Sequence, residues 1–308
     1  MPFLEARNIV KKFANHVALR DVSISVSANT IFGMLGPNGA GKTTLIRIIN
    51  QITGPDSGEI LFDGCPLKAE DVARIGYLPE ERGLYKKMKV GEQALYLCQL
   101  KGLSRNDALK KLRFWFEKFE IGAWWDKKVE ELSKGMQQKV QFITTVLHSP
   151  SLLIFDEPFS GFDPINANLL KEEILELRKG GATVIFSTHN MASVEELCDD
   201  IALINNGRAI LTGTVKEIRQ NFRQNIVRLD FYGDPQQFAN TLSREHEIQE
   251  LETLKEYNTA QIRLSPETSV NSLLTQVMGF CQIHGCQEVL PTMNDIFIRV
   301  VNENKKTV

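Results

Sequence analysis

The sequence has no long hydrophobic run and almost no excess of either charge. None of its apolar stretches approaches the roughly 18 to 20 residues of a membrane-spanning helix, and the run Leu152 to Phe155 leads straight into two acidic residues. The 36 basic residues are balanced by 38 acidic ones, giving a formal net charge of -2. We therefore expect a soluble chain that reaches a membrane only through a partner, and no general attraction to nucleic acid.

Cysteine is also scarce, with five residues in 308. This number is odd and too small for a disulfide framework. Cys281, His284 and Cys286 come closest to a metal-binding pattern, but we place Cys281 at a helix end and Cys286 at a strand, and we expect buried thiols. The first ten residues, which include Glu5 and Arg7, lack the pattern of a secretory signal, so we expect the chain to reside in the cytoplasm.

The hydrophobic patterns predict two domains, residues 1–221 and 222–308. In the first, continuous apolar runs indicate buried strands of an α/β sheet with helices on both faces. These runs are residues 31–35, 152–155, 183–187 and 201–204. A helical subdomain is inserted at about 88–148, with helices expected at 90–101, 104–120 and 133–148.

After residue 222 the pattern resets to strand, helix, strand, strand, helix, strand, followed by a short helix at 295–301. This order is that of the ferredoxin-like, or split βαβ, arrangement and predicts a small α+β domain. We find no catalytic constellation in it. A dimer brace or a regulatory module is therefore favoured over a ligand sensor.

The clearest motif is a phosphate-binding loop, which fits G-x-x-x-x-G-K-[ST] between a predicted strand and a predicted helix. Glycines let successive backbone N–H groups turn inward around an anion, and the following helix directs its positive end to the same point. Lys42 adds a charge for the β- and γ-phosphates, and the Thr43 hydroxyl suits Mg²⁺. The predicted nucleotide-binding residues of the loop are Gly36, Pro37, Asn38, Gly39, Ala40, Gly41, Lys42, Thr43 and Thr44.

A second motif is the pair of carboxylates that ends the strand 152–155, at the edge where parallel sheets place ligand groups. Asp156 suits the coordination of Mg²⁺. Glu157, as the next residue of a strand, would face the other way and is available as the general base that deprotonates a water.

With these residues in place, the sequence resembles the ATP-binding cassette (ABC) ATPases over about residues 1–215. Leu132 to Gln138, Leu-Ser-Lys-Gly-Met-Gln-Gln, resembles the LSGGQ signature, and Ser160 to Asp163 resembles the D-loop. His189 resembles the switch histidine, and Phe13 stands where the family stacks an aromatic ring on adenine. Residues 75–81 resemble the Q-loop, with Glu80 where glutamine is usual.

The resemblance implies a P-loop NTPase fold that binds ATP and Mg²⁺ between two cassettes. Each chain would supply Lys42, Asp156, Glu157 and His189 to one nucleotide, and Ser133 and Gly135 to the other. The catalytic residues would be Glu157, His189 and Lys42, and the metal ligands Thr43, Asp156 and Glu80. The nucleotide contacts outside the phosphate loop would be Phe13, Glu80, Ser133, Gly135 and Asp163.

Two departures from the family pattern refine the resemblance. The signature carries Lys134 and Met136 where glycine and glutamine are common, and Glu80 adds negative charge near the γ-phosphate, which bears on ion preference and hydrolysis rate. The segment Pro-Glu-Glu-Arg-Gly-Leu-Tyr at 79–85 resembles bacterial exporter ATPases that include a sodium-extrusion type. Those proteins tend to carry a small extra C-terminal domain.

We therefore expect the ATP-hydrolysing subunit of a membrane exporter, at the inner face of the cell membrane. Its partners would be itself or a homologous cassette and a separate multi-spanning permease. The aromatic residues of the helical subdomain would divide between core and permease contact; they are Phe114, Trp115, Phe116, Phe119, Trp124 and Trp125. The alternatives are a soluble ABC ATPase of translation or DNA repair, and a non-hydrolysing regulator, which Glu157 and His189 disfavour.

Overall fold

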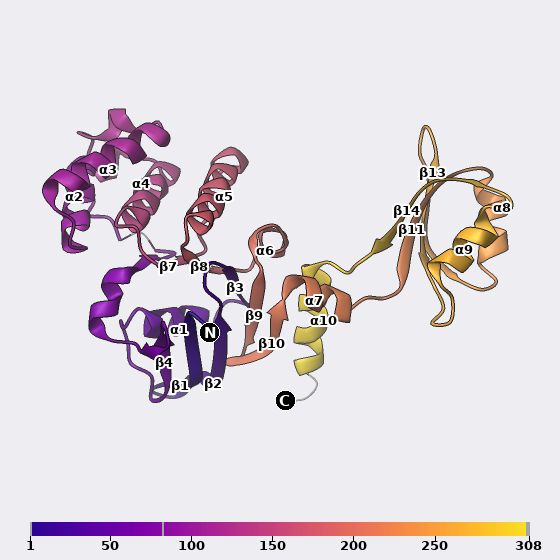
Figure 1. Ribbon diagram of the computed structural model, residues 1–308, viewed down its shortest axis with the longest axis horizontal. Coiled ribbons are helices and arrows are strands. Elements are labelled where there is room, and N and C mark those ends of the chain that lie inside the picture. The colour runs from indigo at the N-terminus through magenta and orange to yellow at the C-terminus, as the bar shows by residue number, and fades with distance from the viewer. Residues whose placement is uncertain (1, 82, 306–308) are drawn as a thin grey trace. The chain divides into compact units, whose positions relative to one another are not determined.

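The computed structural model describes residues 2–81 and 83–305 (Figure 1). The chain forms two compact units. The first runs to Val215 and includes the end of the chain from Val300; the second is Lys216–Arg299. Among the described residues, no helix is long and apolar enough to cross a membrane.

The first unit is built on a six-stranded sheet in the order β10-β9-β3-β8-β7-β6. The strands are β3 (Ile31–Leu35), β6 (Ile75–Leu78), β7 (Leu152–Asp156), β8 (Thr183–Thr188), β9 (Asp200–Asn205) and β10 (Arg208–Thr214). All pair in parallel except β10. The four apolar runs predicted as strands are confirmed, and β3, β7 and β8 are buried along their whole length, as a sheet covered on both faces requires.

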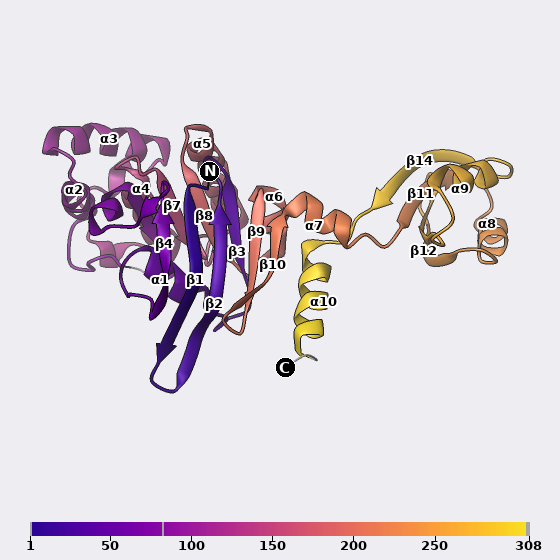
Figure 2. The same ribbon diagram turned by 60° about the horizontal axis from the view of Figure 1, so that its bottom comes forward.

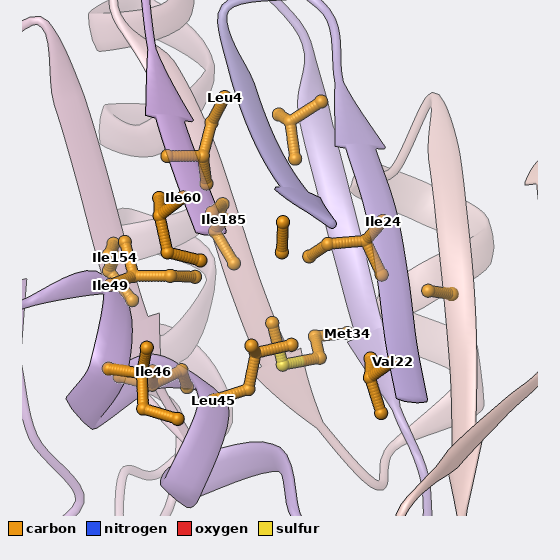
Figure 3. Packing of buried hydrophobic residues seen from close by; sticks show 14 of the residues in the cluster. Leu4, Val22, Ile24, Met34, Leu45, Ile46, Ile49, Ile60, Ile154 and Ile185 are labelled. Atoms are coloured by element: carbon orange, nitrogen blue, oxygen red, sulfur yellow. The ribbon is translucent and has the colours of Figure 1, made fainter. Parts of the chain in front are cut away.

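A second, antiparallel sheet of the same unit has the order β2-β1-β4-β5. Its strands are β1 (Leu4–Phe13), β2 (His16–Val26), β4 (Ser57–Phe62) and β5 (Cys65–Pro66). One hydrophobic cluster joins this sheet to the six-stranded sheet and to helix α1 (Lys42–Ile49). Figure 3 shows Leu4 and Ile24 from the antiparallel sheet near Ile185 of β8 and Leu45 of α1. This packing holds α1, and so the loop before it, against a face of the main sheet.

The inserted helical subdomain consists of α2 (Val90–Leu100), α3 (Arg105–Lys118) and α4 (Lys134–Val146), which lie together in both views of the ribbon (Figures 1 and 2). These helices confirm the sequence prediction. One short 3-10 helix precedes the helical subdomain, at Ala69–Arg74, and two lie within it, at Gly122–Trp124 and Val129–Glu131. Of its aromatic side chains, Trp115, Phe116 and Phe119 are buried, whereas Phe114 is 59% exposed. Trp124 and Trp125 are partly buried. Half of the six aromatic side chains are therefore core, as tilted and edge-on ring contacts around Trp115 also indicate.

Helices α5 (Pro164–Lys179) and α6 (Met191–Leu197) connect the strands of the main sheet, and α7 (Val215–Asn221) follows it. The second unit then contains β11 (Ile226–Tyr232), α8 (Pro235–Leu242), β12 (Glu247–Thr253), β13 (Asn258–Arg263), α9 (Val270–Val277) and β14 (Gln282–Val289), and α10 (Met293–Lys305) ends the described chain. Its antiparallel sheet has the order β12-β13-β11-β14. Because β13 lies between β11 and β12, the predicted split βαβ arrangement is confirmed.

The cysteines are all free thiols. Cys98, Cys198 and Cys281 are buried as expected, but that expectation is wrong for Cys65 and Cys286, which are exposed. Cys286 lies on β14, an edge strand that pairs on one side only, with β11. Within the described ranges no group of three or more His, Cys, Asp or Glu side chains could hold a metal ion.

Candidate active site

The phosphate-binding loop connects β3 to α1 and depends on backbone conformations that glycine favours. Gly36, Gly39 and Gly41 have φ angles of 146°, 78° and 111°. A β-carbon on Gly36 would lie 2.1 Å from the carbonyl oxygen of Ile204, and one on Gly41 would lie 2.7 Å from that of Ala18. No side chain of the described residues caps the start of α1, so its first N–H groups are available to bind an anion.

Lys42 lies at the first turn of α1 and is only 7% exposed. Its ammonium group donates to the carbonyl oxygens of Gly36, at 2.6 Å, and of Pro37, at 3.2 Å. Burial lowers the pKa of Lys42, and the charges of Glu157, Asp156 and Glu80 oppose that shift. The amine is therefore held inside the loop among three carboxylates, where phosphate oxygens can replace the two carbonyls as its partners.

Asp156 ends β7 and is 2% exposed. The Thr43 hydroxyl donates to its carboxylate at 3.2 Å, which joins the end of β7 to the start of α1. Burial raises the pKa of Asp156, and the hydrogen bond from Thr43 partly offsets the shift. The structure thus brings together two of the three oxygen donors that the sequence analysis assigned to Mg²⁺, and such oxygens are the ligands that hard cations prefer.

Glu157 contacts the end of the neighbouring strand β8. Its carboxylate accepts from the backbone N–H of His189 at 3.0 Å and from the Thr188 hydroxyl at 3.1 Å, and it lies 2.6 Å from Nδ1 of His189. The reasoning from strand alternation was wrong in its geometry, because β7 ends at Asp156 and Glu157 has a left-handed φ of 48°. The two residues expected to act together in catalysis are nevertheless in direct contact.

These groups surround a cavity of about 350 Å³. Its lining consists of Phe13, His16, Ala18, Asn38, Gly39, Ala40, Gly41, Lys42, Thr43, Thr44, Glu80, Asp156 and Glu157. Phe13 is 47% exposed and has the ammonium of Lys11 at 5.4 Å from its ring centroid. Its ring is accessible for stacking on a base. Sequence reasoning missed His16, which is placed here only because it pairs with Phe13 across the turn between β1 and β2.

Ser133, Gly135 and Asp163 do not line this cavity. Ser133 caps α4, where its hydroxyl accepts from the N–H of Met136 at 3.3 Å. Asp163 caps α5 and accepts from the N–H of Asn166 at 3.0 Å, a bond that lowers the pKa of Asp163. The start of α4 therefore presents a hydroxyl and a positive helix end at another point of the same unit. Arg82, part of the exporter-like segment, lies outside the described residues.

A second opening, of about 540 Å³, lies between the segment around residues 69–84 and helices α2 and α4. Tyr77, Leu84, Leu97 and Leu100 give it apolar walls, and Leu100 is 63% exposed. His148 also lines it, and neither ring nitrogen has a hydrogen-bond partner within the described parts of the chain. We call this opening the interlobe groove. It carries none of the six aromatic residues that the sequence analysis considered for docking.

Proteins similar to this chain are ATP-binding subunits of ABC transporters, in agreement with a phosphate loop that lines a cavity. The ABC transporter family matches residues 19–160, and the DrrA1-3-like C-terminal domain of ATP-binding proteins matches residues 213–301. The uncharacterised ABC transporter ATP-binding protein YhaQ of Bacillus subtilis is 40% identical over 96% of this chain and 97% of its own. The ABC transporter ATP-binding protein NatA of the same organism is 34% identical over 72% and 89%. A solved ATP-binding subunit of an ABC transporter superposes with a TM-score of 0.67 at 32% identity, covering 71% of this chain and 93% of that one.

Proposed function

Since the chain belongs to the family of ABC transporter ATP-binding proteins, we propose that it powers an exporter by hydrolysing ATP between two cassettes. Members of this family are ATPases that bind ATP and drive transport. The single observation that carries the assignment of residues is the cavity in which Lys42, Thr43, Asp156 and Glu157 meet. The contacts within it assign a role to each.

Binding of the nucleotide rests on the phosphate loop. Its inward N–H groups and the start of α1 bind the phosphates, Lys42 supplies the mobile charge, and Phe13 offers its ring to the base. The Thr43 hydroxyl and the Asp156 carboxylate fit Mg²⁺ because both are oxygen donors already in contact. Glu80 lines the same cavity as a further oxygen donor. When bound, the ion neutralises charge on the phosphates.

Proton transfer rests on the contact between Glu157 and His189. The carboxylate can accept a proton from the attacking water as general base. His189 and the Thr188 hydroxyl fix its position through three contacts of 2.6 to 3.1 Å. Such positioning makes the carboxylate available at the moment of attack without further rearrangement of solvent.

Completion of the site requires a second cassette. Ser133 and Gly135, at the start of α4, do not reach the cavity of their own chain. The positive end of α4 and its free N–H groups suit the γ-phosphate of a nucleotide held by a partner. We infer that two copies, or this chain and a homologue, enclose two nucleotides, so that ATP binding closes the pair and hydrolysis releases it.

The interlobe groove is the surface we assign to the permease. Its walls of Tyr77, Leu84, Leu97 and Leu100 suit an apolar helix face. It lies between Glu80, in the nucleotide cavity, and the helical subdomain that carries the signature, so a bound helix would sense both. This docking would hold the chain at the inner face of the cell membrane.

Replacement of Glu157 by glutamine tests the catalytic assignment. Glu157→Gln keeps the size of the side chain and removes its ability to accept the proton, so we expect turnover to fall at least 100-fold while ATP affinity is retained. Closed dimers should then accumulate in ATP, as measured by size-exclusion chromatography with light scattering. Glu172→Gln, an exposed change of the same charge on α5, is the matched control. Persisting turnover in Glu157→Gln would show that another group is the base.

The permease assignment is tested by affinity purification of the tagged chain from detergent-solubilised membranes, with ATPase activity measured in the same sample. A co-purifying polytopic protein is the expected result. Recovery of full activity with no membrane protein attached, under conditions that preserve other transporters, would contradict the assignment.

A further inference from the structure

A separate cavity of about 550 Å³ lies beside the phosphate loop in the first unit. Its polar lining is basic or amide-bearing: Arg20, Arg208, His16, Asn205, Asn206 and Asn304. No aspartate or glutamate lines it among the residues that the structure describes. In a protein with a net charge of -2, this local excess of positive charge indicates a place for an anion.

The two arginines carry the attraction. Both are exposed, and within residues 2–81 and 83–305 neither guanidinium has an ion-pair partner. An unpaired guanidinium presents a planar fork of N–H donors that matches phosphate oxygens two at a time. Asn205, only 7% exposed, and Asn206 add amide groups at the same opening. A phosphate group would thus meet donors from three strands, β2, β9 and β10, and from the turn between the last two.

The wall of this cavity is bonded directly to the phosphate loop. Asn206 and Gly207 form the two-residue turn between β9 and β10, with left-handed φ angles of 49° and 73°, as a type I′ hairpin turn requires. The Gly207 N–H donates to the Ala40 carbonyl at 2.9 Å, and the Gly207 carbonyl accepts from the N–H of Arg20 at 2.6 Å. A shift of this turn therefore displaces the loop that binds the nucleotide. Gly39 lines both cavities.

We propose that this cavity binds a phosphomonoester, separately from the nucleotide, and adjusts ATP turnover through the turn at Gly207. The group could belong to a free phosphorylated metabolite or to the headgroup of phosphatidic acid, since both present a phosphomonoester. Asn304, near the end of α10, lines the cavity as well, so the ligand also contacts the last helix of the chain. The effect on turnover rests on the proposed ATPase function; the binding does not.

Binding is measured on the full chain with the nucleotide cavity filled by saturating Mg·ADP, so that the phosphate loop itself cannot accept the probe. Glycerol 3-phosphate is titrated by calorimetry. We expect one additional site in the wild type, weakened at least tenfold in Arg20→Ala/Arg208→Ala. The control Arg113→Ala/Arg244→Ala removes the same charge from exposed positions elsewhere and should bind like the wild type. ADP affinity is compared in all three to show that the phosphate loop is intact.

The source of the phosphate is decided by flotation with phosphatidylcholine vesicles that do or do not contain phosphatidic acid. Flotation that needs phosphatidic acid and is lost in Arg20→Ala/Arg208→Ala identifies a lipid headgroup. Calorimetric binding without flotation identifies a free metabolite. Absence of both, or equal binding by the double variant, overturns the proposal. A chain that binds the probe but never hydrolyses ATP would instead refute the proposed function and leave this site standing.

Discussion

Two glycines of the phosphate loop give a sharp test of how the structure constrains this segment. Both have φ angles that disfavour a side chain, 146° for Gly36 and 78° for Gly39. Their surroundings differ completely. A β-carbon on Gly36 would meet the Ile204 carbonyl oxygen at 2.1 Å and the Ala40 β-carbon at 3.2 Å, whereas no atom of the described residues lies within 4 Å of one on Gly39.

The difference sets the expected magnitudes. Gly39→Ala should cost only the left-handed conformation, about 1 to 2 kcal/mol of unfolding free energy. Gly36→Ala adds a collision with the backbone of β9 that no side-chain rotation relieves. A shift of that kind in a packed interior costs a further 1 to 3 kcal/mol or so, so we expect about 2 to 5 kcal/mol in total. Displacement of the loop should also abolish ADP binding in Gly36→Ala, because its N–H groups no longer converge.

Tryptophan fluorescence in urea measures these costs for the first unit alone, because the tryptophans of the chain, Trp115, Trp124 and Trp125, all lie in its helical subdomain. The unfolding free energies follow by linear extrapolation, and calorimetry with ADP reports the loop. Equal destabilisation by Gly36→Ala and Gly39→Ala would refute the argument, since it would mean that the contact with Ile204 carries no energy.

Two further predictions concern stability. Lys118 of α3 contacts the carboxylate of Glu173 of α5 at 2.5 Å, and Glu173 is 5% exposed. Because Lys118→Met leaves a buried charge unpaired, we expect the free energy of unfolding in urea to fall by about 1 to 3 kcal/mol. Most of this loss should be recovered in Lys118→Met/Glu173→Gln. Burial lowers the pKa of His148 from 6.5 to about 4. Below pH 6.5 the unfolded chain therefore takes up a proton at His148 that the folded chain does not. The free energy of unfolding is unaffected by this group above pH 6.5 and decreases as the pH falls toward 4. Between pH 7 and pH 5 the wild type should lose about 1 to 2 kcal/mol more than His148→Leu, and an identical loss in both would exclude His148 as the cause.

The buried strands were predictable because each is one continuous apolar run. The segment 183–187, for instance, is apolar or β-branched at nearly every position and forms β8, which is buried throughout. The antiparallel sheet gave no such signal. In β1 the pairing with β2 shifts register between Ala6 and Ile9 and again before Lys11. Each shift reverses the face that the next residues occupy, so no simple alternation of apolar and polar residues survives.

The candidate site also has a part that the sequence predicts and a part that it does not. The phosphate loop could be predicted because its function lies in consecutive residues with one backbone requirement. Contacts that join distant segments could not be derived from the spacing of residues. Only the family resemblance related Glu157 to His189. Nothing in the sequence placed His16 in the nucleotide cavity or Arg20 beside Arg208. Those placements depend on the register of β1 with β2 and on the turn that bonds Gly207 to the phosphate loop.

The charges around Lys42 bear on our proposal that the nucleotide is bound together with a divalent cation. One buried ammonium faces three carboxylates, Glu157, Asp156 and Glu80. Two like charges about 5 Å apart repel by about 3 kcal/mol at an effective dielectric constant of about 20, so a polyphosphate alone would be opposed by more than Lys42 can offset. A divalent ion held by Asp156 would turn the repulsion between this carboxylate and the phosphates into an attraction. On this proposal Glu80, where related cassettes usually carry neutral glutamine, would make nucleotide binding depend more steeply on the cation than a glutamine would.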